Sequence, residues 1–176
     1  MNNISCKPLV VVALCLSACL GLGWQPGQAS EGRAGTRDKY AFHLSAMVTD
    51  AELDKPALTQ DRPLVLFVWA PDCPACLRHL PYAQALYKNL DLEKVNFMSL
   101  AISDSQDEVK EVMDDKGLEF PVLWSGSGTI GDGFEYDGWP TTYVFKQGGR
   151  LQEMVESTGS AYMKDVESAV AAALKN

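Results

Sequence analysis

The sequence predicts an α/β domain whose mixed central sheet carries helices on both faces. An unbroken apolar run, Leu64–Trp69, predicts a central strand, because a strand without polar positions must be covered on both faces. Helical and extended patterns alternate after this run, which predicts parallel strands joined by crossover helices. Two extended segments around Gly148 and Gly149 predict an antiparallel hairpin beside those strands.

The first half of the domain contains one ambiguous segment. Residues 40–48 predict a first strand, whereas residues 50–58 show no decisive periodicity and leave a short helix open. A helix is predicted from Cys73 onward, because Pro74 suits its first turn and apolar side chains then recur at helical spacing. These apolar positions are Cys76, Leu80, Ala83, Tyr87 and Leu90.

The second half continues the alternation and closes with a helix. Its predicted elements are a strand at 95–102, a helix at 106–116, an extended segment at 118–123, a loop at 125–132, strands at 141–146 and 150–155, and a helix at 160–174. Ser103 or Ser105 can cap the first of these two helices, and Gly117 fits the position after its end. The final helix is expected to bury Met163, Val166, Val170, Ala173 and Leu174.

An apolar N-terminal segment predicts export. Lys7 is the only charged side chain before Glu31, and the apolar run between them is typical of a secretory signal. We interpret residues 1–29 as this signal, residues 30–39 as a flexible leader and residues 40–176 as the folded domain.

The sequence leaves the processing of the signal open. Small residues at 27–29 suit cleavage after Ala29, whereas Leu-Ser-Ala-Cys at 16–19 resembles a bacterial lipobox that would place a lipid on Cys19. The apolar run is also close to the roughly 17–25 residues of a membrane span, so an uncleaved anchor is a third outcome. In each case the domain is expected in the periplasm or cell envelope, and only its N-terminal segment would contact the membrane.

Charge and cysteine usage narrow the classes of function. From residue 30 onward, 14 Lys and Arg oppose 23 Asp and Glu, a net charge of −9, and no basic patch is present. Nucleic acid is therefore not an expected partner. Three of the five cysteines lie in the export signal, so its cleavage leaves only Cys73 and Cys76 in an oxidising compartment.

Cys73 and Cys76 suit thiol–disulfide exchange. At a helix start, unpaired N–H groups and the helix dipole favour the thiolate of Cys73, which is the attacking species. Cys76, one turn later, can then resolve the mixed disulfide. A structural zinc site needs about four ligands, and the exported chain adds only His43 and His79. An inert bridge would stabilise the fold little, because the loop that it closes is very short.

A family resemblance supports this interpretation. Residues 67–76, Phe-Val-Trp-Ala-Pro-Asp-Cys-Pro-Ala-Cys, together with Pro81, resemble the active-site segment of thioredoxin-like proteins, and the closest branch is the TlpA/ResA/CcmG-like group of bacterial envelope oxidoreductases. Three further segments resemble that group, at residues 117–123, 138–145 and 148–150. The resemblance spans residues 60–175 and implies a thioredoxin-like fold, exchange of a Cys73–Cys76 disulfide with protein dithiols, and no cofactor.

The resemblance also implies how partners bind. Pro140 would adopt the cis form and, with Trp139 and Thr141, form a ledge against which the extended chain of a client pairs. Asp72 and Pro74 would border the same substrate site. The implied partners are a client protein with a disulfide or dithiol and a membrane dithiol reductant of the DsbD type. The expected direction is that of a reductant.

Four residues depart from the family pattern, and one of them is Trp139, which is bulkier than the residue that relatives often have before the proline and would alter docking. Asp72 stands where the family usually has tryptophan, and its carboxylate should raise the pKa of Cys73. Phe67 replaces a polar residue, which removes a buried acid that moves protons in thioredoxin. His79 stands where ResA-like proteins carry glutamate, three residues after Cys76 and on the same side of the helix. Either His79 takes the proton of Cys76 or stabilises a thiolate, or it is a solvated side chain without a role.

Two other classes of function stay open at this stage. A CxxC motif with His79 nearby could hold Cu(I), which prefers soft thiolate ligands, although no second histidine lies near the motif. The domain could also be a binding module that keeps the fold and uses its thiols only incidentally. Replacing Cys73 with serine would leave such binding intact.

Overall fold

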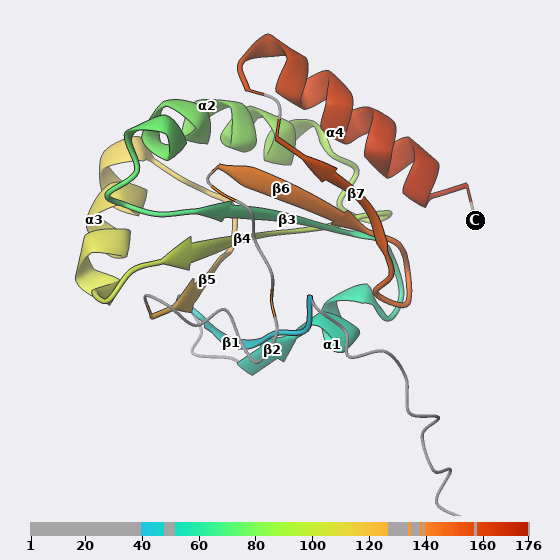
Figure 1. Ribbon diagram of the computed structural model, residues 1–176, viewed down its shortest axis with the longest axis horizontal. Coiled ribbons are helices and arrows are strands. Elements are labelled where there is room, and N and C mark those ends of the chain that lie inside the picture. Colours follow the sequence, from blue (N-terminus) through green and yellow to red (C-terminus); the bar gives the residue numbers. More distant parts are fainter. Residues whose placement is uncertain are drawn as a thin grey trace, which may run out of the picture. The chain divides into compact units, whose positions relative to one another are not determined.

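The computed structural model describes residues 40–47, 52–126, 134, 138, 140–156 and 158–175. Within these residues, seven strands form one sheet in the order β2-β1-β5-β4-β3-β6-β7 (Figure 1). The strands are β1 (His43–Ala46), β2 (Glu52–Asp54), β3 (Leu64–Trp69), β4 (Asn96–Ile102), β5 (Val122–Ser125), β6 (Thr141–Phe145) and β7 (Leu151–Val155). The helices are α1 (Lys55–Thr59), α2 (Pro74–Asn89), α3 (Gln106–Lys116) and α4 (Ser160–Ala173).

Strand β3 lies inside the sheet because its side chains are apolar on both faces, and all six of its residues are buried. It pairs parallel with β4 on one side and antiparallel with β6 on the other, so the predicted mixed sheet is confirmed. Trp69 pairs with Ala101, and Val68 pairs with Thr141. The carboxyl ends of β3 and β4 and the amino end of β6 therefore meet at one edge of the sheet.

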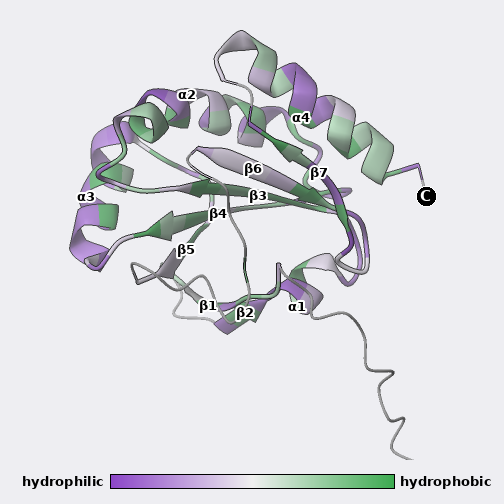
Figure 2. Ribbon diagram, viewed as in Figure 1, coloured by the Kyte–Doolittle hydropathy of each residue, from purple (hydrophilic) through white to green (hydrophobic). Residues whose placement is uncertain are grey.

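Helices cover both faces of the sheet, as predicted, but unequally (Figure 1). The units β3-α2-β4 and β4-α3-β5 step across the sheet in the same direction, so right-handed crossovers bring α2 and α3 to the same face. Helix α4 joins them, and Leu80, Val109 and Val166 of the three helices share one apolar cluster. Leu58 of the short helix α1 packs on the opposite face. Figure 2 shows β3 as largely hydrophobic, whereas hydrophilic and hydrophobic residues alternate along the helices.

Local capping signals set the helix boundaries. Asp54 accepts an N–H of α1 at 2.8 Å, so the ambiguous segment 50–58 contains a short strand and then a short helix. Ser105, rather than Ser103, caps α3 by accepting an N–H at 3.3 Å. Gly117 ends that helix in the left-handed conformation, and the bounds of α3 match the prediction.

The predicted export signal, residues 1–29, and the leader, residues 30–39, lie outside the described residues. The described residues all fall within one compact unit, Thr36–Asn176. None of the helices in this part of the chain is long and apolar enough to cross a membrane.

We expect Gly117→Ala to lower the free energy of unfolding by about 1 kcal/mol, because an alanine is strained in the left-handed region. Gly117 has a φ of 58°, and a Cβ there would meet no atom within 4 Å, so backbone strain is the only penalty. Urea denaturation measures the change. Gly126→Ala is the matched control, since its Cβ also meets no atom and its φ lies outside that region. An equal loss of free energy of unfolding in both variants would contradict backbone strain at position 117 as the cause.

Candidate active site

Cys73 lies at the junction between β3 and α2. The chain turns within residues 70–72, and the Cys73 N–H donates to the Ala70 carbonyl oxygen at 3.2 Å. Cys73 has an extended backbone, with φ −97° and ψ 104°, and Pro74 begins the helix at a position where its missing N–H is not needed. The junction therefore places Cys73 at the N-cap of α2.

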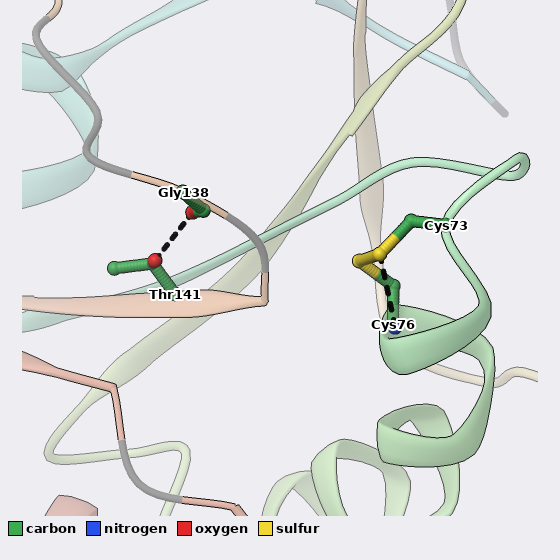
Figure 3. The surroundings of a disulfide bond; sticks show 4 residues. All are labelled: Cys73, Cys76, Gly138 and Thr141. Atoms are coloured by element: carbon green, nitrogen blue, oxygen red, sulfur yellow. Dashed lines mark hydrogen bonds between the residues drawn. A yellow bond between two sulfur atoms is a disulfide. The ribbon is translucent and has the colours of Figure 1, made fainter.

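Cys73 and Cys76 form a disulfide across the first turn of α2 (Figure 3). Their Cα atoms lie 5.2 Å apart. The Cys76 N–H donates to Cys73 Sγ at 3.1 Å, so one backbone donor of the first turn points at this sulfur. Negative charge on Cys73 Sγ would be stabilised by this N–H and by the helix dipole, which is the condition for a reactive thiolate.

The two cysteines differ in accessibility. Cys76 is fully buried within the apolar cluster under α2, whereas Cys73 is half-buried at its margin. Asp72 and Pro74, on either side of Cys73 in the chain, are exposed. A large partner can therefore reach Cys73 more readily than Cys76.

The amino end of β6 faces the disulfide (Figure 3). Thr141 pairs with Val68, the residue before the last in β3, and its buried hydroxyl donates to the Gly138 carbonyl oxygen at 2.6 Å. Pro140, between these two residues, is half-buried. Trp139, the other predicted ledge residue, lies outside the described residues. The structure thus brings Pro140 and Thr141 to the edge that carries Cys73, and the cis form of Pro140 stays a prediction.

His79 is buried, so the interpretation as a solvated side chain is wrong. It is only 3% exposed, because Phe67, Tyr82 and Tyr162 surround its ring. The ring stacks on Phe67 with centroids 5.7 Å apart and meets Tyr162 of α4 in a T-shaped contact at 4.2 Å. Burial lowers the pKa of His79, which keeps the imidazole neutral at pH 7.

In this oxidised state His79 lies near Cys76 on α2 but shares no hydrogen bond with either cysteine. Cys76 and His79 lie one turn apart on α2, which brings their Cβ atoms to about 5–6 Å. No hydrogen bond joins the His79 ring to Cys73 or Cys76, all three of which the structure describes. Proton transfer between Cys76 and His79 therefore stays a prediction.

Two buried residues, Tyr162 and its partner Thr142, are not among the predicted site residues. The hydroxyls of Thr142 in β6 and Tyr162 in α4 share a hydrogen bond of 2.9 Å, and both residues are 1% exposed. Tyr162 lies one turn before Val166, so helical periodicity could have placed it on the inner face of α4. Its contact with His79 joins two separate helices, and no local pattern signals that.

The described residues around the disulfide do not include a cluster of metal ligands. No three side chains of His, Cys, Asp or Glu gather there in a way that could hold a metal ion. Cys73 and Cys76 are bonded to each other, and the neighbours of His79 are aromatic. The reaction that this arrangement itself can perform is the breaking and re-forming of the disulfide.

A mixed sheet of this order, with a Cys-Pro-Ala-Cys disulfide at the start of the helix after its central strand, defines a thioredoxin-like protein. The AhpC/TSA family model matches residues 41–154. The chain belongs to the AhpC/TSA family.

Curated relatives carry names of the same class. The chain is 29% identical over 93 residues to the thiol-disulfide oxidoreductase ResA of Oceanobacillus iheyensis, which covers 53% of this chain and 48% of that protein. It is 28% identical over 113 residues to the thiol:disulfide interchange protein DsbE of Vibrio cholerae, with coverage of 63% and 59%. The chain thus spans about half the length of these relatives.

Solved structures show the same fold. A secreted Mycobacterium tuberculosis disulfide oxidoreductase, homologous to E. coli DsbE, superposes with a TM-score of 0.62 at 21% identity, covering 78% of this chain and 99% of that one. A thiol:disulfide interchange protein of the thioredoxin family from Chlorobium tepidum gives a TM-score of 0.60 at 20% identity, with coverage of 77% and 94%. These likenesses confirm the predicted thioredoxin-like fold.

We expect the folded protein to lose stability as the pH falls below the ordinary His79 pKa of about 6.5. Burial lowers the pKa of His79 in the folded state, so the unfolded chain binds this proton more tightly, and acid favours unfolding between the two pKa values. Urea denaturation at about pH 7.5 and pH 5.5 measures the loss, and His79→Gln should reduce it.

His43→Gln is the matched control for this measurement, because the chain has only two histidines and the His43 side chain is 66% exposed. This variant keeps the buried His79, so the loss of stability that His79 causes at acid pH should remain. The buried, neutral state of His79 would be contradicted by identical pH dependence in the wild type and His79→Gln.

Proposed function

We propose that this protein is an exported thiol–disulfide oxidoreductase that exchanges its Cys73–Cys76 disulfide with protein dithiols. The observation that carries this proposal is the disulfide at the first turn of α2, where the more accessible sulfur accepts a helix N–H. The names of the ResA and DsbE relatives support the exchange reaction, and the apolar segment within residues 1–29 supports export. The proposed location is the periplasm or cell envelope, with residues 1–29 as signal or anchor and residues 40–176 as the domain.

In the reductive direction, the exchange consists of two attacks. The Cys73 thiolate attacks a client sulfur, the client disulfide breaks, and one client sulfur leaves as a thiolate and takes a proton. Cys76 then gives its proton to His79, and the Cys76 thiolate attacks Cys73 Sγ. This attack forms the Cys73–Cys76 disulfide and releases the second client thiol. The client gains two electrons, and a membrane dithiol of the DsbD type returns them to the protein.

The client segment is proposed to lie against the amino end of β6. Pro140, in the cis form, and the backbone of Trp139 would provide the ledge, and Thr141 would brace it. The support is that Thr141 pairs with β3 at the edge where the disulfide lies. Asp72 and Pro74 would border the opposite side of the bound segment, because both are exposed next to Cys73.

The proposed direction is reduction of the client. The helix start stabilises a thiolate on Cys73, whereas the carboxylate of the neighbouring Asp72 opposes it. A less stable thiolate makes the dithiol a better electron donor. Thioredoxin, with a reduction potential of about −270 mV, is such a donor, whereas a strong oxidant of this fold has a potential of about −120 mV.

Cys76→Ser is expected to accumulate a mixed disulfide between Cys73 and a client, because the resolving thiol is absent. Non-reducing gels and mass spectrometry of envelope extracts detect the trapped complex. Cys73→Ser is the matched control; it should trap nothing and lower the rate of client reduction more than about 100-fold. The proposal fails if Cys76→Ser traps no protein and the wild type neither reduces nor oxidises any dithiol.

Equilibration with glutathione is expected to place the wild type among the reductants, nearer about −270 mV than −120 mV. Asp72→Asn should shift the equilibrium about two- to fivefold toward the dithiol, the range of an exposed charge pair, because the Cys73 thiolate loses a repulsive neighbour. Asp61→Asn is the matched control, since Asp61 is also exposed but precedes β3 at the opposite edge of the sheet. A wild-type value close to that of a strong oxidant would overturn the proposed direction.

A further inference from the structure

A closed ring of contacts joins four elements around His79. Phe67 of β3 stacks on the His79 ring of α2, and the His79 ring meets Tyr162 of α4 with centroids 4.2 Å apart. The Tyr162 hydroxyl shares a hydrogen bond of 2.9 Å with Thr142 of β6. Thr142 in turn pairs with Phe67 across the sheet, which closes the ring. None of these four residues is more than 3% exposed.

Packing, rather than hydrogen bonding, holds the His79 ring. No residue in the described ranges shares a hydrogen bond with either ring nitrogen. A neutral imidazole accepts a proton only at the nitrogen that carries none, so the orientation of the ring decides whether it can serve Cys76. Tyr162 makes the shortest ring contact, and its own ring is fixed at the hydroxyl by Thr142.

We propose that Tyr162, anchored by Thr142, is a positioning residue that holds the His79 ring in the orientation that accepts the proton of Cys76 during the resolving attack. This inference rests on the proposed function, because it concerns the second of the two attacks. The proton moves from Cys76 Sγ to a ring nitrogen of His79, the Cys76–Cys73 bond forms, and the bond between Cys73 and the client breaks. His79 then returns the proton to solvent or to the departing client thiolate.

The side chains in contact with the His79 ring are aromatic. β3 presents the apolar ring of Phe67, α2 presents the exposed Tyr82, and α4 presents Tyr162, while Cys76 lies one turn before His79 on α2. Desolvation is the cause of the lowered His79 pKa, and no charged neighbour contributes to it. Burial raises the pKa of Tyr162, so its hydroxyl stays protonated and serves only as a hydrogen-bonding anchor.

The two attacks can be timed separately with the aromatic disulfide DTNB. Attack by Cys73 on DTNB releases one coloured thiolate, and attack by Cys76 on the resulting mixed disulfide releases a second. We expect Tyr162→Leu to slow the second release about tenfold or more at pH 7, because a misplaced base loses much of its effect. The first release should change less than about twofold.

Conservative variants keep the test valid if Tyr162→Leu does not fold. Tyr162→Phe keeps the ring and loses the hydroxyl, and Thr142→Val loses the partner of that hydroxyl. Each should slow the second release about threefold, and the double variant should be no slower than either single one. Tyr87→Phe is the matched control, since this α2 tyrosine contacts Phe97 and lies outside the ring of contacts; it should change neither release.

The decisive comparison uses the His79→Gln background and the pH profile. The second release in the wild type should slow as acid protonates His79, and His79→Gln should remove this dependence and slow the step about tenfold or more. In that background Tyr162→Leu should have no further effect. An equal effect of Tyr162→Leu with and without His79, or an unchanged second release in His79→Gln, overturns the inference while leaving the exchange by Cys73 and Cys76 intact. Absence of any second release from the wild type would instead overturn the proposed function.

Discussion

The hydrogen bond from the Cys76 N–H to Cys73 Sγ is the interaction on which the site depends. A sulfur here occupies the position that a serine or aspartate oxygen takes at other helix starts. The buried strand β3 fixes where the chain arrives, and Pro74 fixes where the helix begins. Because one contact both caps α2 and aims a backbone donor at the sulfur, the start of the helix and the reactivity of Cys73 are a single structural feature.

Phe67 changes what the neighbourhood of this cap can do. A polar side chain at this fully buried position would need a hydrogen-bond partner, whereas the ring of Phe67 provides a flat apolar surface on which His79 stacks. The titratable group of the site therefore comes from α2 instead of β3. An imidazole can be buried in neutral form without a charged partner, and a carboxylate cannot be kept ionised so easily in such surroundings.

Features set by neighbouring residues were predictable, and features set by distant contacts were not. The apolar run of β3 and the cap signals of α3, Ser105 and Gly117, are local, and the structure has these elements at their predicted positions. The proximity of Cys73 and Pro140 came from a family resemblance, because no pattern within the chain joins residues so far apart. The sequence leaves the burial of His79 open, since this burial depends on α4 packing against α2. The predicted inner face of α4 is also partly wrong, because Leu174 is 45% exposed, whereas Tyr162 is buried.

Strand β6 connects the two halves of the proposed mechanism. Successive side chains of a strand point to opposite faces, so Thr141 and Thr142 serve different neighbours although they are adjacent. Thr141 bonds to Gly138 and braces the segment where a client is proposed to lie, while Thr142 holds Tyr162 against His79. Both hydroxyl groups are buried and bonded, so each position resists displacement. A shift of β6 at its amino end would therefore alter the client ledge and the position of His79 together.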